Sequence, residues 1–229
     1  MSTNTPTNDF KTQGFILRRT NYGEADRILN ILTPNGKISA IARSARKEKS
    51  KLAGGIEMFC LSEFGIHQKK DSLGTITSAR MIKYYKNILS DLSKLELASA
   101  FLKKISIIAE NSDSPDFYQI LLQVLEALNN NYDATLIEVW FLFNTAQALG
   151  EDINLYRDTT GKKLVAEQTY TWDVAESALC PDPRGQIGTD EIKLMRLILS
   201  SNLNVVTRIK NPSPMLAKII HIGKAINKM

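Results

Sequence analysis

The sequence predicts an α+β protein in which a small closed β-barrel is followed by an all-helical domain. In the first third of the chain, short apolar segments alternate with turn residues, which is the pattern of short strands. From about residue 87 the apolar positions recur with the period of a helix. Charge changes at the same place: residues 1–86 hold 15 Lys and Arg against 7 Asp and Glu, whereas residues 87–229 hold 14 against 17. We therefore predict a basic barrel domain over 1–86 and a helical domain over 87–229.

Five apolar segments account for the predicted barrel, and a short disordered polar tail over residues 1–10 precedes them. The turn Thr33-Pro34-Asn35-Gly36 predicts a hairpin in which Asn-Gly supplies the positive φ angles. Five short strands with turns between them are typical of a small barrel such as the OB-fold. The predicted strands are 14–20, 27–32, 37–43, 57–67 and 73–81.

The helical domain is predicted from amphipathic stripes and from residues that favour helix starts. Asp133 is the expected N-cap of one helix, which Gly150 ends, and Ser213-Pro214 opens the last. Residues 150–188 are polar and rich in turns, so we expect an irregular insertion there. The stripes cover residues 92–105, 117–128, 133–150 and 189–198, with the last helix beginning at 213.

The strongest functional signal is the segment RSARKEKSK, residues 43–51, between two predicted strands. Five of its nine residues are basic: Arg43, Arg46, Lys47, Lys49 and Lys51. A loop of this kind, without large apolar residues, is expected to be mobile when free and to close on a phosphate backbone. Each phosphate that it neutralises releases counterions, so binding should weaken steeply as salt rises.

Four more basic residues of the predicted barrel are candidate nucleic-acid contacts. Arg18 and Arg19 are neighbours in one strand, so they point to opposite faces and at most one of them faces a given ligand. The full set of candidate binding residues is therefore Arg18, Arg19, Arg27, Lys37, Arg43, Arg46, Lys47, Lys49 and Lys51.

Aromatic residues that could stack on bases are few in the barrel. Phe59 and Phe64 have opposite parity along one strand, so one of them is expected in the core. Tyr22, in a predicted loop, is the best stacking candidate, although covering the end of the barrel explains it equally well. Basic charge with little stacking favours contact with the backbone and weak sequence preference.

Catalytic motifs are not found in the sequence. Gly54-Gly55 lacks the Lys-Ser/Thr of a phosphate-binding loop, and neither GxSxG nor HExxH occurs. We therefore expect no enzyme activity and no cofactor. The polar N-terminus has no signal pattern and no apolar run is long enough to span a membrane, so we expect a cytoplasmic protein. Cys60 and Cys180 are expected to be free thiols.

Residues 14–66 resemble the N-terminal domain of the RecO family. The resemblance rests on Tyr22-Gly23-Glu24, on Thr33 to Lys37, and on the series Ser50, Leu52, Gly54 and Phe59. It implies an OB-fold that binds single- and double-stranded DNA and anneals complementary strands. It also implies partnership with RecR and with the C-terminal tail of single-stranded-DNA-binding protein, and through them the loading of RecA.

The chain departs from the family pattern at its zinc site. Many members hold zinc through two CxxC pairs, which align here with Arg157 and Thr160 and with Cys180 and Pro183. Only Cys180 remains, and structural zinc needs four ligands. We therefore expect no metal, with an irregular segment at about 150–188 in place of the zinc site.

Two other classes of function remain open from the residues alone. One is an RNA-binding OB-fold protein. The other is a protein adaptor without annealing activity, whose helical half docks an acidic peptide in an apolar groove. Lys103 and Lys104 are candidates for the basic edges of such a groove, and a solvated helix face is the alternative explanation for both.

Overall fold

The computed structural model describes residues 7–69, 73–112 and 114–227. Contacts between Cα atoms divide the chain into two compact units, residues 1–125 and 126–229. The barrel occupies the first unit and ends at Tyr84, close to the predicted end of the barrel domain. The first unit also includes two helices and most of a third.

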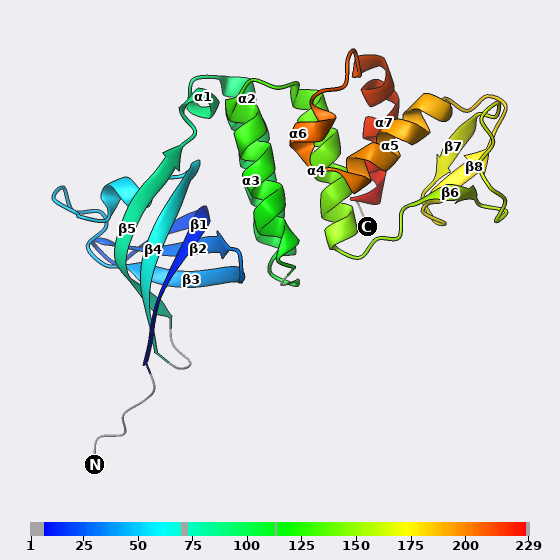
Figure 1. Ribbon diagram of the computed structural model, residues 1–229. Coiled ribbons are helices and arrows are strands. Elements are labelled where there is room, and N and C mark those ends of the chain that lie inside the picture. Colours follow the sequence, from blue (N-terminus) through cyan, green and yellow to red (C-terminus); the bar gives the residue numbers. More distant parts are fainter. Residues whose placement is uncertain (1–6, 70–72, 113, 228–229) are drawn as a thin grey trace. The chain divides into compact units, whose positions relative to one another are not determined.

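The five predicted strands are present and close into a barrel in the order β1-β2-β3-β5-β4 (Figure 1). β1 starts earlier than predicted because residues 7–15 pair with β4, from Thr7 opposite Lys69 to Phe15 opposite Leu61. Residues 7–10 are therefore strand and not tail; residues 1–6 of the expected tail lie outside the described residues. The strands are β1 (Thr7–Tyr22), β2 (Asp26–Thr33), β3 (Gly36–Ala42), β4 (Cys60–Lys69) and β5 (Gly74–Tyr84).

The hairpin between β2 and β3 turns where the sequence predicted it. Thr33 pairs with Gly36, and the Thr33 hydroxyl donates to the Gly36 carbonyl at 2.8 Å. Gly36 has a φ of 104°, but Asn35 is not in the left-handed region. Only one of the two expected positive φ angles is therefore present, and a hydrogen bond from the Asn35 amide to the Thr33 hydroxyl helps to fix the turn.

The barrel has an apolar core and a second apolar layer on the outside of β1. A register shift between Ile16 and Arg18 allows Phe15, Ile16 and Leu17 all to be buried. Ile16 belongs to the core, whereas Phe15 packs outward on Tyr118, with ring centroids 5.6 Å apart. The other large core residues are Leu29, Ile31, Ile56, Phe64, Ile66 and Ile76.

Three helices follow the barrel: α1 (Lys86–Leu89), α2 (Leu92–Ile108) and α3 (Asp116–Asn129). Asp91 caps α2 by accepting from the Lys94 amide at 3.1 Å. Tyr85, between β5 and α1, is fully buried and stacks on Phe15. In this way the outer surface of β1 is covered by the helical part of the first unit.

The second unit contains α4 (Ala134–Ala148), α5 (Thr189–Ser200), α6 (Leu203–Val206) and α7 (Ser213–Ile226). Asp133 caps α4 as predicted, accepting from the Leu136 amide at 2.7 Å. Ser213 is the first residue of α7 and not its N-cap, since Pro212 precedes it without a side-chain cap. α4 is buried on most sides, and the Trp140 indole donates to the Ser201 carbonyl at 3.0 Å.

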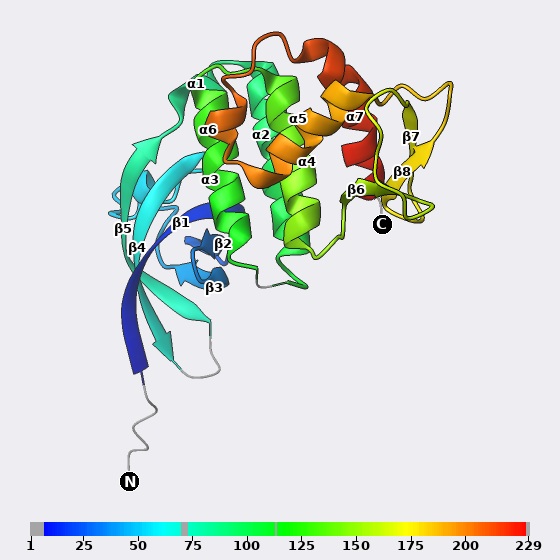
Figure 2. The same ribbon diagram turned by 45° about the vertical axis from the view of Figure 1, so that its right-hand side comes forward.

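The prediction of an all-helical C-terminal domain was wrong for part of the expected irregular insertion. β6 (Asn154–Asp158), β7 (Tyr170–Asp173) and β8 (Ala178–Pro181) form a three-stranded sheet in the order β6-β8-β7 (Figure 2). Tyr170 and Leu179 are fully buried in this sheet. Apolar packing therefore organises a segment that had been expected to be irregular. None of the helices over the described residues combines the length and the apolar character that a membrane-spanning segment requires.

Candidate nucleic-acid interface

The basic loop after β3 is fixed at its base by the barrel. The Ser44 amide donates to the Asp26 carboxylate at 2.6 Å, and the Arg46 amide donates to the Ala25 carbonyl at 2.8 Å. Between them Ala45 is buried in the barrel core. The loop contains no large apolar residue, and the buried side chain that anchors it is the small Ala45.

The far end of the loop is closed by a short 3-10 turn, Ala53–Gly55. Gly55 lies so close to the backbone of Ala79 on β5 that a Cβ at this position would overlap it. Gly54 beside it has open space around it. Both ends of the loop are therefore held against the barrel, and its basic middle projects from it.

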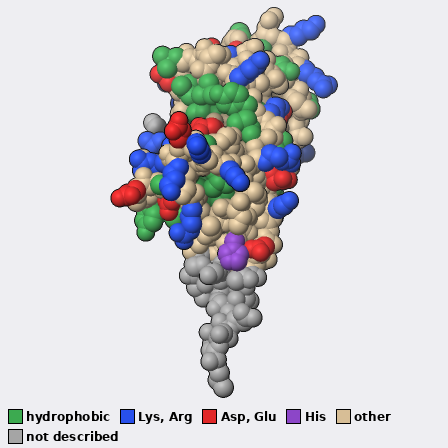
Figure 3. All heavy atoms as spheres, turned by 90° about the vertical axis from the view of Figure 1, so that its left-hand side faces the viewer, with side chains coloured by type: hydrophobic (Ala, Val, Ile, Leu, Met, Phe, Trp, Pro, Cys, Tyr) green, Lys and Arg blue, Asp and Glu red, His purple; other side chains and the backbone are tan. Residues whose placement is uncertain are grey.

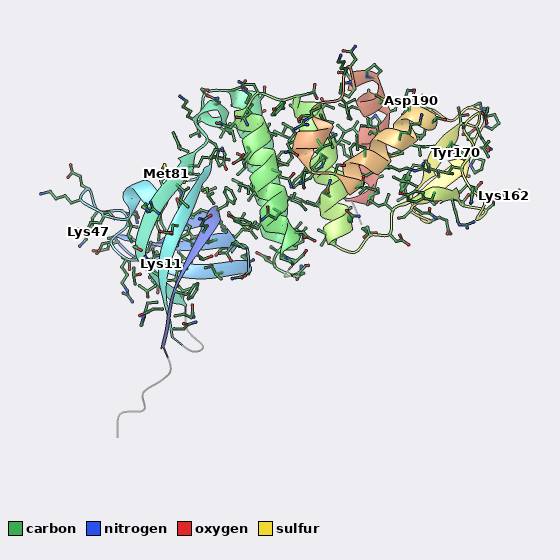
Figure 4. All side chains as sticks on the ribbon, in the orientation of Figure 1. Lys11, Lys47, Met81, Lys162, Tyr170 and Asp190 are labelled. Carbon is green, nitrogen blue, oxygen red and sulfur yellow. The ribbon has the colours of Figure 1, made fainter. Side chains whose placement is uncertain are left out.

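The five basic side chains of this loop are all exposed to solvent; they are Arg43, Arg46, Lys47, Lys49 and Lys51. None of them forms an ion pair with an acidic side chain in the described ranges. Figure 4 shows Lys47 on the loop, pointing away from the strands. Figure 3, which faces this side of the first unit, shows several Lys and Arg side chains close together with fewer acidic ones among them.

Two of the other candidate cations are neutralised within the first unit. The Arg19 guanidinium lies 2.9 Å from the Glu57 carboxylate and also donates to the Ile56 carbonyl. The Lys37 ammonium lies 3.5 Å from the Glu110 carboxylate, and only 16% of the Lys37 side chain is exposed. Both residues are therefore partly engaged in the protein itself.

The remaining two candidates, Arg18 and Arg27, differ in exposure. Arg18 is exposed and lines a groove beside α2. Arg27 is half-buried on β2. Lys11 was missed by the sequence analysis because the predicted strand began at residue 14; it is exposed on β1 (Figure 4).

Where the family pattern places zinc ligands, hydrogen bonds to one carboxylate hold the chain. Asp158 accepts from the Thr160 hydroxyl at 2.7 Å, the Thr160 amide at 2.8 Å and the Lys162 amide at 3.0 Å. The hydrogen bond from the Thr160 hydroxyl is the largest influence that lowers the pKa of Asp158, and the two amides add to it. This turn occupies the place of the first missing CxxC pair.

At the first position the Arg157 guanidinium also donates to the Gly161 carbonyl at 2.7 Å. At the second position Cys180 lies half-buried in β8, opposite Thr171 of β7. Over residues 7–69, 73–112 and 114–227, no three His, Cys, Asp or Glu side chains come together as metal ligands. Cys60 and Cys180 are both free thiols, as predicted, and burial raises the pKa of Cys60.

Comparison with known proteins identifies the family. Residues 7–85 match the model of the Recombination protein O N terminal domain, and residues 89–224 match that of its C terminal domain. The chain is 33% identical over 225 residues to the DNA repair protein RecO of Dehalococcoides mccartyi strain 195, an alignment that covers 94% of this chain and 88% of that protein. It is 28% identical to the DNA repair protein RecO of Roseiflexus sp. RS-1, and the alignment covers 93% of this chain and 81% of that protein. It is 30% identical to the DNA repair protein RecO of Staphylococcus haemolyticus, and the alignment covers 76% of this chain and 72% of that protein. The chain belongs to the RecO family of DNA repair proteins.

Proposed function

We propose that this chain binds DNA through the basic loop of its barrel and anneals complementary strands. The observation that carries the proposal is the set of five exposed cations between residues 43 and 51, which no described acidic side chain neutralises. The Arg46 guanidinium donates to the Gly23 carbonyl at 3.3 Å, which leaves its charge without an acidic partner. Cations that no acidic side chain neutralises are available to replace the counterions of a phosphate backbone.

The barrel topology supports the same proposal. β1 pairs with both β2 and β4, and β3 closes the barrel by a short parallel pairing with β5 at Ala40–Gly74 and Ile41–Thr75. We infer from this order that the barrel is an OB-fold, a five-stranded architecture that commonly binds oligonucleotides.

Annealing would follow from charge neutralisation alone. Two DNA strands repel each other through their phosphates, and a cationic surface that contacts both backbones lowers this repulsion. No ATP and no catalytic step are needed, so the proposal includes that the chain is not an enzyme. It also includes a cytoplasmic location, and cooperation with RecR and with single-stranded-DNA-binding protein in the loading of RecA.

The test is the rate at which two complementary oligonucleotides form a duplex, followed by fluorescence energy transfer across a series of salt concentrations. The test variant replaces the five basic residues of the loop with Ala. A matched control replaces five exposed basic residues of the second unit: Lys162, Lys163, Lys193, Arg208 and Lys210.

The loop variant should lose both DNA binding and accelerated annealing at moderate salt, whereas the control should keep both. Equal losses in the two variants would show that net charge matters and the loop does not. The same experiment with matched RNA strands addresses the RNA-binding alternative: tighter binding to RNA than to DNA would favour it.

A second candidate function, docking of an acidic peptide, is supported by a cavity in the second unit. The cavity has a volume of about 440 Å³, between the three-stranded sheet and α7. Apolar side chains of Ile187 and Ile222 line it, together with Asp182 and two basic residues. Lys218 is paired with Glu191 at 2.6 Å, so Arg184 is the cation of this cavity that an acidic peptide would meet. The Trp172 indole nitrogen at this cavity is buried and has no hydrogen-bond partner among the described residues.

Lys103, one of the two predicted edge residues, does line an apolar groove, but that groove lies in the first unit and not at this cavity. Calorimetry with the acidic C-terminal tail peptide of single-stranded-DNA-binding protein tests the candidate. Arg184→Glu should abolish the heat of binding, while Arg208→Glu, an exposed control on the same unit, should not. Binding that survives Arg184→Glu would remove this cavity from consideration.

A further inference from the structure

A groove in the first unit lies between β1 and α2 and is separate from the basic loop. Its volume is about 390 Å³, within the range of roughly 300–1,000 Å³ that is usual for small-ligand sites. Leu17 of β1 and Leu102 of α2 are buried at its walls. Met58 and Phe59, just before β4, and Ile107 of α2 complete an apolar lining.

Two cations line this groove from opposite elements. Arg18 comes from β1 and Lys103 from α2, and both side chains are exposed. The acidic residue of the lining is Glu110, whose carboxylate lies 3.5 Å from the ammonium of Lys37. The charge of Glu110 is thus offset within the protein, and the groove presents an apolar floor with positive charge on two sides.

Phe59 has a backbone conformation that is rare for an aromatic residue. Its φ is 56°, in the left-handed region where a bulky side chain is strained. The conformation is held in place because the Phe59 carbonyl accepts from the amide of Tyr85, and Tyr85 is fully buried. Strained residues of this kind are concentrated at ligand clamps, and Phe59 itself is only half-buried.

The geometry points to this groove as the site of one unpaired base of single-stranded DNA, which stacks on Phe59 while Arg18 and Lys103 hold the adjoining phosphates. A nucleotide strand alternates an apolar ring with phosphates on both sides, and the groove alternates an apolar floor with cations on both sides. The inference rests on the proposed DNA binding and adds to it a reason why single strands would be preferred. The bases of a duplex are paired and stacked, so they cannot enter a groove of this kind.

The test compares Phe59→Leu, which keeps an apolar side chain but removes the aromatic face, with Tyr132→Leu, which removes an exposed aromatic residue of the second unit. Fluorescence anisotropy gives the dissociation constant for a single-stranded oligonucleotide and for the matched duplex. Loss of one stacked base should raise the single-strand constant of Phe59→Leu by about 5- to 150-fold. Its duplex constant should not change, and Tyr132→Leu should leave both constants unchanged.

A second measurement does not depend on how the variant folds. The unchanged protein is irradiated with an oligonucleotide that contains 5-iododeoxyuridine, and the cross-linked peptide is identified by mass spectrometry. A cross-link at Phe59 supports the inference. Cross-links confined to other residues would overturn it, as would loss of duplex and single-strand binding by equal factors in Phe59→Leu.

The outcome for the loop separates this inference from the proposed function. Suppose that the loop variant with five Ala substitutions loses DNA binding but Phe59→Leu keeps its affinity for single strands. The groove is then not a base site, and the proposed function stands. If the loop variant binds both DNA forms like the unchanged protein, the proposed function fails. If an acidic apolar peptide occupies the groove and no base cross-links there, the groove serves a protein partner and the inference is wrong.

Discussion

The internal ion pairs predict that the candidate cations contribute unequally to DNA binding. Lys47 and Lys49 are exposed and have no acidic partner in the described part of the chain, whereas Lys37 is paired with Glu110 at 3.5 Å. We compare two double variants, Lys47→Gln/Lys49→Gln and Lys37→Gln/Glu110→Gln. The first removes two available charges, and the second removes one charge together with its partner.

The expected magnitudes follow from counterion release. Each phosphate contact on a single strand contributes about 0.7 to the slope of log K against log salt, so the first variant should lower the slope by about 1.4. If the binding lines converge near 1 M salt, this corresponds to roughly 25-fold weaker binding at about 100 mM. The second variant should change the slope by much less than the roughly 0.7 of one contact.

Fluorescence anisotropy at five or more salt concentrations measures both slopes on the same oligonucleotide. Circular dichroism checks that each variant remains folded. A slope that falls by about 0.7 in the second variant would mean that Lys37 contacts DNA in spite of Glu110. Equal changes in the two variants would refute the reasoning that internal pairing decides which cations are available.

The other predictions concern the stability of each unit and its metal content. The Glu191 carboxylate accepts from Lys218 at 2.6 Å and from the amide of Gly188 at the start of α5. Glu191→Ala should therefore lower the free energy of unfolding, measured with urea, by about 1.5–3 kcal/mol. Burial alone would raise the pKa of Glu191, but these hydrogen bonds hold the pKa below its ordinary 4.5. The contribution of Glu191 to stability is therefore complete above pH 4.5 and is lost as pH falls through the pKa of the folded protein. If the Ala variant lost stability at acidic pH in the same way as the unchanged protein, this reasoning would be contradicted. Asp158→Ala should speed hydrogen exchange of the two amides that its carboxylate accepts from, with exchange of the α4 amides as the internal control. Gly55→Ala should destabilise the protein by about 1–3 kcal/mol because its Cβ would overlap β5, whereas Gly54→Ala should change stability by well under about 1 kcal/mol, and equal thermal shifts would argue against the close packing. Elemental analysis of the purified protein should find no stoichiometric zinc; one zinc per chain would overturn that expectation.

The sequence predicted those parts of the structure that depend on local pattern. The five strands, the cap at Asp133 and the exposed basic loop each follow from residues close together in the chain. The sheet over residues 154–181 was not predicted because β6 and β8 are short and pair across a long connection, so neither leaves a clear period in the sequence.

The sequence predicted which residues of the candidate site are basic. It did not predict which of them are paired with acidic residues in the folded protein. Arg19 and Lys37 are as basic in sequence as any loop residue. Their partners, Glu57 and Glu110, are far away in the chain and come close only in the folded protein. The groove beside α2 was missed for the same reason, since the strand and the helix that line it are separated by most of the barrel sequence.

The pairing of β1 with β4 has a consequence for how the protein folds. Residue 7 pairs with residue 69 and residue 15 with residue 61, whereas the β2–β3 hairpin joins neighbours through a two-residue turn. Contacts between distant residues form more slowly because a long loop must first be closed. The hairpin should therefore form first, and during synthesis the first strand must wait for β4 to leave the ribosome before the barrel can close. Until then the edge of β1 that pairs with β4 has no partner strand, so this is a stage at which the growing chain is susceptible to aggregation.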